Sequence, residues 1–300
     1  MPELPRDAFA ALSPRTAIVC YDAGAANVII AGLLQAGAQD LRVCMQGPAA
    51  RLWEQAFGST VLYPTPHAAL DGATLLLSGT GWASALEHDA RALARAAGIK
   101  SIALLDHWVN YPQRFERGGK VVLPDEIWVT NEDAMHLARE NFPGLPLSQV
   151  ENWYLKQQLA MLGKSDIYAQ PELLYLAEPT RSDWGRGTPG EFQALEYFVS
   201  KLPQLGLPHG LQIRLRPHPS DEPGKYEAWM QVHTELALEL DRSVTMADAL
   251  GRASWVAGCE SYGLALALAA GRRVFCTLPP WAPPCRLPQV GLIHLAALDR

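Results

Sequence analysis

The chain has 300 residues, of which 49% are hydrophobic, and carries a formal net charge of -6 with a pI near 5.8. This length predicts two domains of about 150 residues each, and the apolar content is sufficient for two cores. An acidic chain lacks the basic surface needed to bind nucleic acid or coat an anionic membrane, so we expect no nucleic-acid partner.

Five cysteines stand far apart in the chain and form no CxxC pair. They are Cys20, Cys44, Cys259, Cys276 and Cys285. An odd number of cysteines in apolar runs is typical of a reduced, cytoplasmic protein and indicates neither a disulfide framework nor a zinc site. The N-terminus has no basic segment before an apolar core, and no apolar run reaches the roughly 18 residues of a membrane span. We therefore expect a cytoplasmic protein.

The first half of the chain, from Thr16 onward, alternates short apolar runs with amphipathic stretches of helical spacing. The predicted strands are TAIVCYD, LRVCMQG, ATLLLSGTG, KSIALLDHW and DEIWVTN. Strands that alternate with helices of about ten or more residues form parallel βαβ units. Residues 1–150 are therefore predicted to form a Rossmann-like α/β domain.

The same alternation restarts in the second half, after a predicted linker at residues 151–170. The predicted strands there are ELLYLAEPT, LQIRLRP, ELALELD, SWVAGCE and RRVFCTLPP. Residues 171–300 are therefore predicted to form a second Rossmann-like domain. The predicted fold class is α/β, with two parallel-sheet domains facing a cleft toward which the carboxyl ends of both sheets point.

Two glycine-containing turns follow predicted strands in the first domain. In CYDAGAAN, Asp22 is a candidate catalytic base, and Gly24 and Asn27 are candidate substrate contacts. In SGTGWAS, Gly79 and Gly81 allow a ligand to approach the backbone. Both turns have a structural alternative, because Asp commonly caps a helix and a GxG turn can simply precede one.

The stretch LLDHWVNYPQRF places polar and aromatic side chains just after a predicted strand. Asp106 and His107 are catalytic candidates, since a carboxylate beside a histidine can orient or tune a proton-transfer group. Further candidate contacts with the substrate are Trp108, Asn110, Tyr111 and Arg114. The two aromatic rings could stack on a sugar ring. The structural alternative is a buried carboxylate that pairs with the arginine and fixes a loop.

The stretch QIRLRPHPSD ends a predicted strand of the second domain. Arg214 and Arg216 share one face of that strand by its period of two, and His218 falls on the same face if the strand persists. Pro217 and Pro219 restrict the backbone on either side of the histidine at little entropic cost. Guanidinium and imidazole groups suit a diphosphate better than a metal cation, which predicts a donor-phosphate site. The alternative is a rigid turn that closes an exposed strand.

The stretch AGCESYGLALALAAG passes from a predicted strand into a helix. Free N–H groups at a helix start suit a phosphate, and Ser261 could add its hydroxyl. Glu260 could accept hydrogen bonds from ribose hydroxyls, and Gly263 keeps the first helical turn slim. Ordinary helix capping is the alternative for both polar residues.

Two α/β halves with RPHP and GCESYGLALALAAGRRV in the second resemble the GT-B glycosyltransferases. The resemblance is closest to bacterial enzymes of surface-polysaccharide assembly, including sialyltransferases, related nonulosonate transferases and the glycerophosphotransferases of teichoic acid synthesis. It implies that His218 and Pro219 contact the donor phosphate, with Ser261 adding a contact and Glu260 binding the ribose. It also implies a general base from the N-terminal domain.

The resemblance implies a metal-independent glycosyltransferase. Such an enzyme transfers a sugar from a nucleotide-sugar donor, for instance a CMP-linked nonulosonate, to a bacterial glycan or lipid-linked acceptor, and peripheral membrane association is left open. No cofactor or metal is expected, because arginines, a histidine and a helix N-terminus can neutralise the leaving phosphate. Two alternatives keep the fold: a nucleotide-sugar hydrolase or 2-epimerase, and a non-catalytic sugar-nucleotide binding module.

Overall fold

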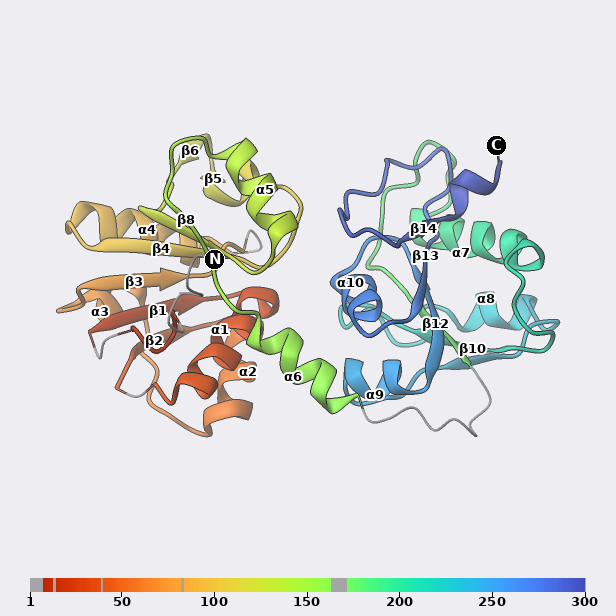
Figure 1. Ribbon diagram of the computed structural model, residues 1–300, viewed down its shortest axis with the longest axis horizontal. Coiled ribbons are helices and arrows are strands. Elements are labelled where there is room, and N and C mark those ends of the chain that lie inside the picture. The colour runs from red at the N-terminus through yellow and green to blue at the C-terminus, as the bar shows by residue number, and fades with distance from the viewer. Residues whose placement is uncertain (1–7, 13–14, 39, 82–83, 163–171, 300) are drawn as a thin grey trace, which may run out of the picture. The chain divides into compact units, whose positions relative to one another are not determined.

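A computed structural model describes residues 8–12, 15–38, 40–81, 84–162 and 172–299 of the chain. The chain divides into two compact units, unit 1 (Met1–Gln157) and unit 2 (Gln158–Arg300), coloured red to green and green to blue in Figure 1. Helix α6 (Trp153–Met161) lies in the predicted linker, whose residues 163–170 are outside the described residues.

Unit 1 contains a six-stranded, all-parallel sheet in the order β2-β1-β3-β4-β7-β8. Its strands are β1 (Thr16–Cys20), β2 (Arg42–Met45), β3 (Leu75–Ser78), β4 (Lys100–Leu105), β7 (Glu126–Val129) and β8 (Leu147–Gln149). The first five correspond to the five predicted strands. The antiparallel pair β5 (Glu116–Arg117) and β6 (Lys120–Val121) forms a small separate hairpin.

Helices cover both faces of the unit 1 sheet. They are α1 (Ala23–Ala36), α2 (Gly47–Phe57), α3 (Pro66–Leu70), α4 (Leu86–Ala96) and α5 (Glu132–Asn141), with a 3-10 turn η1 (Pro112–Phe115). Strand β1 alternates between two cores: Ile18 packs with α1 and α2, and Val19 packs with α3 and α4. Burial on both faces explains why this strand is apolar throughout rather than at every second residue. No helix in the described ranges is long and apolar enough to cross a lipid bilayer.

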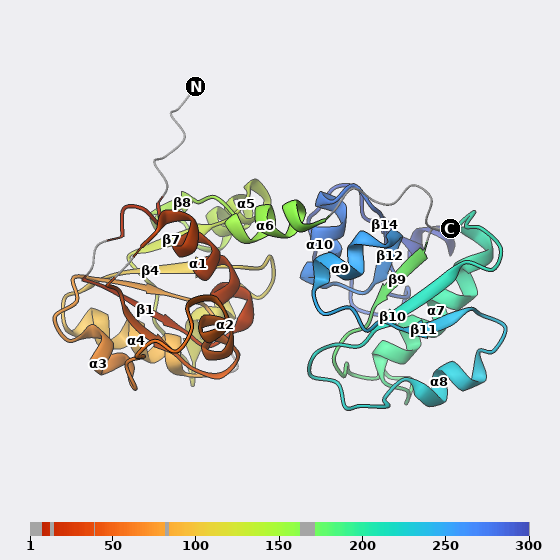
Figure 2. The same cartoon turned by 90° about the horizontal axis from the view of Figure 1, so that it is seen from below.

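Unit 2 repeats the architecture with a parallel sheet in the order β11-β10-β9-β12-β13-β14 (Figures 1 and 2). Its strands are β9 (Glu172–Leu176), β10 (Gln212–Arg216), β11 (Leu238–Leu240), β12 (Ala253–Gly258), β13 (Arg273–Cys276) and β14 (Ile293–His294). Its helices are α7 (Gly190–Lys201), α8 (Glu227–Val232), α9 (Met246–Gly251) and α10 (Tyr262–Ala269), with 3-10 turns η2 (Leu202–Gln204) and η3 (Leu295–Asp299). The predicted class of two Rossmann-like parallel-sheet domains is confirmed.

The strand order creates one topological switch point in each unit. In unit 1 the chain leaves β1 for β2 on one side and later returns to β3 on the other. In unit 2 it leaves β9 for β10 and later returns to β12. The loops at the carboxyl ends of such strand pairs separate in opposite directions, and open α/β sheets bind ligands in the crevice that results. A ligand site is therefore expected at the carboxyl edge of each sheet.

One close contact in the core of unit 1 depends on a helical glycine. A Cβ atom on Gly32 of α1 would stand 2.4 Å from the Phe9 ring. Phe9 is 1% exposed and packs edge-to-face on Trp128 with ring centroids 5.4 Å apart, so it has little room to move. Glycine at this position lets the N-terminal segment seal the core.

Replacing this glycine should therefore overpack the core. We expect Gly32→Ala to lower the free energy of unfolding by about 1–3 kcal/mol. Gly251→Ala is the matched control, because a Cβ there meets nothing within 4 Å. The control should leave stability unchanged or raise it by up to about 1 kcal/mol. Urea denaturation followed by circular dichroism measures both, and equal midpoints for the two variants would contradict the packing argument.

Candidate functional site

Two carboxylates of unit 1 lie against glycines at the carboxyl edge of its sheet. Asp22 follows β1, and its Oδ2 is 2.2 Å from where a Cβ on Gly81 would stand. Asp106 follows β4, and its Oδ2 is 1.9 Å from the corresponding position on Gly24. The two glycines therefore make room for the two carboxylates, which lie at or beside the β1/β3 switch point. Asp22 occupies the N-cap position of α1 but makes no side-chain cap hydrogen bond, so capping does not explain it.

Asp106 forms an ion pair with Arg114, with Oδ1 3.1 Å from Nη1 and side chains only 14% and 10% exposed. Arg114 also donates to the backbone oxygens of Val109, at 3.0 Å, and Thr80, at 3.4 Å. The pair thus ties the loop after β4 to the loop after β3, as the structural alternative predicted. The ion pair also orients the Asp106 carboxylate, as a residue that transfers protons requires.

A third acid, Glu87 of α4, is buried beneath this edge. Its side chain is 0% exposed, and Oε1 accepts a 2.7 Å hydrogen bond from the backbone N–H of Tyr21. Its Oε2 has no hydrogen-bond partner among the described residues. Burial raises the pKa of Glu87, and the charge of Asp22 raises it further, against lowering by the Tyr21 N–H and Arg91. Glu87 therefore keeps its proton to a higher pH than an exposed glutamate does.

The aromatic residues expected to stack on a sugar are packed inside unit 1. Trp108 is 7% exposed, and its indole N–H donates to Asn131, which caps α5. Tyr111 is 2% exposed and stacks on Phe142. These burials correct the expectation of exposed stacking faces, because aromatic rings after a buried strand are themselves drawn into the core.

Four other candidates of unit 1 lie on or near the same edge. His107 is half-buried, and its Nδ1 accepts a 2.9 Å hydrogen bond from the Trp108 N–H, so Nε2 carries the ring proton. Asn110 adopts the left-handed conformation with φ of 60°, which asparagine tolerates in turns. Asn27 lies half-buried on α1. Gly79 packs closely, since a Cβ there would be 2.8 Å from the Cys20 sulfur.

In unit 2, the His218 loop after β10 is held by its own polar groups. The backbone N–H of His218 donates to Asp221 at 2.8 Å, and the Ser220 N–H donates to the Nδ1 of His218 at 3.2 Å. Nδ1 is thus an acceptor, which places the ring proton on Nε2. Burial lowers the pKa of His218, although Asp221 and Glu178 act against it. The histidine is therefore a neutral N–H donor at neutral pH rather than a cation.

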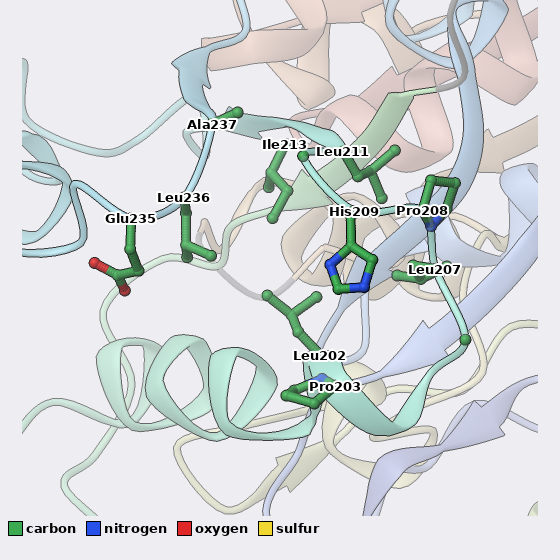
Figure 3. A pocket seen from close by; sticks show the side chains of 12 residues that line it. Leu202, Pro203, Leu207, Pro208, His209, Leu211, Ile213, Glu235, Leu236 and Ala237 are labelled. Atoms are coloured by element: carbon green, nitrogen blue, oxygen red, sulfur yellow. The ribbon is translucent and has the colours of Figure 1, made fainter.

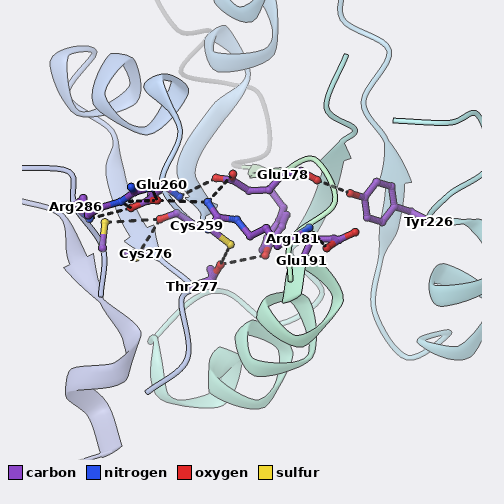
Figure 4. Close-up of polar contacts among 11 residues, drawn as sticks. Glu178, Arg181, Glu191, Tyr226, Cys259, Glu260, Cys276, Thr277 and Arg286 are labelled. Atoms are coloured by element: carbon purple, nitrogen blue, oxygen red, sulfur yellow. Dashed lines mark hydrogen bonds and ion pairs between the residues drawn. The ribbon is translucent and has the colours of Figure 1, made fainter. Parts of the chain in front are cut away.

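An ion-pair cluster joins the ends of β9 and β12 at the unit 2 switch point (Figure 4). Arg181 donates to Glu178 at 2.8 Å, and Glu178 accepts from the backbone N–H of Glu260 at 2.8 Å. Glu260 also accepts from the backbone N–H of Arg286 at 2.9 Å and pairs with its guanidinium. Burial alone would raise the pKa of Glu260, but Arg286 and Arg181 outweigh it and lower the pKa. The carboxylate is thus ionised and held in place.

Helix α10 begins at this cluster. Ser261 is its N-cap residue, yet its hydroxyl makes no side-chain cap hydrogen bond. A Cβ on Gly263 would be 2.6 Å from Leu176 of β9, so glycine lets the first turn pack closely on the sheet. The start of α10 therefore lies at the switch point, and the Ser261 hydroxyl there does not cap the helix.

The two arginines of β10 share one face, as predicted, but their partners are protein carboxylates. Arg214 is 1% exposed and pairs with Asp241 and Glu172. Arg216 pairs with the other oxygen of Asp241, and its side chain is 20% exposed. The burial of Arg214 corrects the expectation that it contacts phosphate: a strand interior buried on both faces leaves its guanidinium no path to a ligand. Pro219, at the loop tip, is exposed.

Unit 2 also contains two cavities. One of about 450 Å³ opens at the amino-terminal ends of β10 and β11, and Figure 3 shows its mixed lining, with leucines such as Leu202 and Leu236 beside His209 and Glu235. Another, of about 660 Å³, is lined by Cys285, His294 and several prolines. The first lies at the end of the sheet opposite to the one where α/β proteins bind ligands, so it is not part of the candidate site.

Solved structures with this fold include UDP-GlcNAc 2-epimerases. The enzyme of Neisseria meningitidis, bound to UDP-GlcNAc, matches with a TM-score of 0.58 and 12% identity over 87% of this chain and 82% of that one. The enzyme of Methanocaldococcus jannaschii matches with a TM-score of 0.56 and 10% identity over 87% and 83% of the two chains. The S. aureus MnaA–UDP complex matches with a TM-score of 0.57 and 13% identity over 87% and 78%.

These matches establish a GT-B-like fold for the chain. At such low identities they establish the fold alone. No protein-family model and no curated protein matches the chain. The resemblance to sialyltransferases and nonulosonate transferases therefore rests on the sequence motifs only.

Sequence reasoning missed several residues of both edges. They are Glu87, Glu178, Arg181, Asp221, Asp241 and Arg286. Glu178 and Arg181 follow a predicted strand in AEPTR, which is the same signal that identified Asp22 and Asp106. Arg286 gave no signal, because it lies in a proline-rich loop and reaches Glu260 only through the fold.

Asp241 should be the most costly side chain to remove in unit 2. Its side chain is 0% exposed and pairs with Arg214 and Arg216. Asp241→Ala leaves the buried Arg214 with Glu172 as its one remaining carboxylate partner among those described and removes the partner of Arg216, so we expect a loss of about 3–5 kcal/mol at neutral pH. Glu239→Ala, at an exposed position of β11, the strand that ends directly before Asp241, is the control and should change stability by less than about 0.5 kcal/mol.

The loss should depend on pH in a defined direction. Burial would raise the pKa of Asp241, but Ser243, Arg216 and Arg214 lower it overall. A carboxylate whose pKa is lowered by folding stabilises the protein fully at pH values above its ordinary pKa of about 3.9. This stabilisation is lost as the pH falls through the pKa of the folded state. The difference in the free energy of unfolding between wild type and Asp241→Ala, measured by denaturant titration, should therefore become smaller below about pH 4. A constant difference across that range would contradict the ion-pair account.

Proposed function

We propose that the chain is a nucleotide-sugar enzyme of the 2-epimerase type, in which unit 2 binds the nucleotide diphosphate and carboxylates of unit 1 transfer protons. The observation that carries this proposal is the group of donors at the β9/β12 switch point. The hydroxyl of Ser261 and the start of α10 lie there next to Glu260, which pairs with Arg181 and Arg286, and His218, with its proton on Nε2, follows the neighbouring strand β10. Solved structures of the same fold that contain UDP-GlcNAc or UDP support it.

The hydrogen-bond donors of unit 2 would bind a diphosphate through their fixed orientation and not through an excess of positive charge. Each arginine of the cluster is already held by a carboxylate, Arg181 by Glu178 and Arg286 by Glu260. A diphosphate there meets N–H and O–H groups whose positions are fixed before it arrives. Preorganised donors of this kind stabilise a leaving phosphate without reorganisation and without a required metal ion. The same balance of charge predicts only a modest dependence of nucleotide binding on salt.

Inverting C2 of the sugar requires a base that takes the C2 proton while the C1–O bond to the diphosphate breaks and a C1–C2 double bond forms. An acid must then return a proton to the opposite face of C2 as the C1–O bond re-forms. Unit 1 places Asp22 and Asp106 at one sheet edge, the second oriented by Arg114. Glu87 beneath them holds its proton to a higher pH than an exposed glutamate. Because the raised pKa of Glu87 favours its neutral form more than in an exposed glutamate, Glu87 adds less negative charge beside the other two carboxylates, one of which would serve as base.

Nucleotide binding should depend on His218. UDP should raise the melting temperature of the wild-type protein, since a ligand at 100 times its dissociation constant stabilises by about 2.7 kcal/mol. His218→Ala should weaken binding by about 10- to 100-fold, because a hydrogen bond to a charged group is worth about 1.5–3 kcal/mol. Thermal shifts with UDP, CDP, GDP and CMP measure this effect and identify which nucleobase the protein prefers.

His209→Ala is the matched control for the histidine. His209 is exposed and lies on the loop before β10, at the other end of the strand from His218. Its replacement should leave every nucleotide shift unchanged. If none of the four nucleotides shifts the melting temperature of the wild-type protein, the proposal fails at its first step.

Turnover should depend on the carboxylates of unit 1. UDP-GlcNAc incubated with the protein in D2O should give the 2-epimer with solvent deuterium at C2, observed by proton NMR. Asp22→Asn or Asp106→Asn should lower this rate by at least about 100-fold, the usual contribution of a general base or acid. The UDP-induced thermal shift should persist in both variants. Exposed Asp71 provides the control variant Asp71→Asn.

Other products would redirect the assignment. Free sugar and UDP in place of an epimer would indicate a hydrolase. Unchanged rates in both Asp22→Asn and Asp106→Asn would remove these residues as base candidates.

A glycosyltransferase is the second candidate, supported by the sequence motifs RPHP and GCESYG. The same carboxylates would then deprotonate an acceptor hydroxyl, either on a glycan or on a lipid-linked sugar. This candidate predicts nucleotide binding without turnover until an acceptor is added. Acceptor dependence therefore separates it from the epimerase in a single NMR series.

A further inference from the structure

Three side chains of types that can ligate a metal lie close together at β13, β14 and the loop between these strands. None of the three belongs to the candidate site described above. They are Cys276, Cys285 and His294, whose ligand atoms all lie within 4.8 Å of one another. Cys276 ends β13 and is 1% exposed, whereas Cys285 is half-buried and His294 is exposed. No other group of three or more His, Cys, Asp or Glu residues in the described ranges has this geometry.

The fold brings these residues together from a regular spacing in the chain. Cys276 and His294 are partners in the parallel pairing of β13 and β14. Neighbouring strands lie about 4.8 Å apart, so paired residues present their side chains on the same face at short distance. Cys285 stands halfway between them in the sequence, in the loop that joins the two strands.

The loop is built to hold Cys285 in place. It reads LPPWAPPCRLP, with Pro283 and Pro284 directly before the cysteine. Prolines restrict the backbone of the unfolded chain and lower the entropic cost of a fixed loop. Both sulfurs already converge on one acceptor, the backbone oxygen of Cys259, at 3.1 Å from Cys276 and 3.9 Å from Cys285.

We propose that Cys276, Cys285 and His294 bind a zinc ion that fixes the proline-rich loop. Two thiolates and an imidazole are ligands that zinc prefers, and the cavity of about 660 Å³ lined by Cys285 and His294 leaves room for water as the fourth ligand. On binding, the two thiols release their protons to solvent and the neutral imidazole coordinates through one nitrogen. The site departs from the expectation, based on sequence spacing, that no zinc site is present.

The position of the zinc gives it a role in the candidate site. Arg286 directly follows Cys285 and holds the carboxylate of Glu260. A metal bound to Cys285 would therefore restrain the loop that positions Arg286 at the β9/β12 switch point. An effect on nucleotide affinity rests on the proposed function, whereas zinc binding does not.

Zinc content of the reduced full-length protein tests the site directly. After incubation with zinc and desalting, elemental analysis should find about one zinc per chain, as in a single Cys2His site. Cobalt in place of zinc should give thiolate-to-metal charge-transfer absorption. Cys285→Ser and His294→Asn should weaken binding by at least about 100-fold in competition with a chromogenic chelator, since even outer-shell partners are worth about 10- to 100-fold.

Two control variants keep the test specific. Cys44→Ala removes a thiol from unit 1, and His209→Asn removes an exposed histidine from unit 2; both should bind zinc as the wild type does. Circular dichroism of Cys285→Ser without metal checks that it folds, which its half-buried position favours. Zinc should raise the melting temperature of wild type but not of Cys285→Ser.

Three outcomes would overturn the assignment. They are zinc bound in less than stoichiometric amount by fully reduced protein, equal affinity in Cys285→Ser, and a cobalt complex without thiolate absorption. A Cys276–Cys285 disulfide in air-exposed protein, together with no zinc binding after reduction, would identify the pair as redox-active instead. None of these results depends on whether a nucleotide binds.

Discussion

The organisation of this molecule depends on one constraint, the burial of both faces of a parallel sheet. Strands such as β1 and β9 are apolar on both sides because helices cover both. Apart from the buried ion pairs of Arg214 within unit 2, the polar groups described above gather at the carboxyl ends of the strands, beside the switch points. Asp22 and Asp106 in unit 1, and Glu260 and His218 in unit 2, all follow directly from this placement.

The carboxyl edges of the two sheets carry different kinds of polar group. Unit 1 accumulates carboxylates around glycine turns, and a single arginine, Arg114, orients one of them. Unit 2 pairs each carboxylate with a cation and leaves neutral donors, His218 and Ser261, without a charge partner. An acidic edge suits proton transfer, and an edge of oriented donors suits a diphosphate. This division of labour is the physical basis of the proposed function.

Most of the fold was predictable because strand and helix periods differ clearly along the chain. The predicted strands around Thr16 and Gln212 correspond to β1 and β10. Short elements such as β14 were not predicted, since two residues carry no period. The positions of site residues after strands were predictable, but their partners were not: Arg214 looked like a phosphate ligand until the fold placed Asp241 beside it. Long-range pairs of this kind depend on strand order, which local sequence patterns do not encode.

Binding of a nucleotide diphosphate at the β9/β12 switch point of unit 2 can be observed in a crystal structure of the protein with UDP. We expect diphosphate density at the start of α10, within hydrogen-bonding distance of the Ser261 hydroxyl and the Nε2 of His218. Density in the cavity at the amino-terminal ends of β10 and β11, or no density at the start of α10, would contradict it.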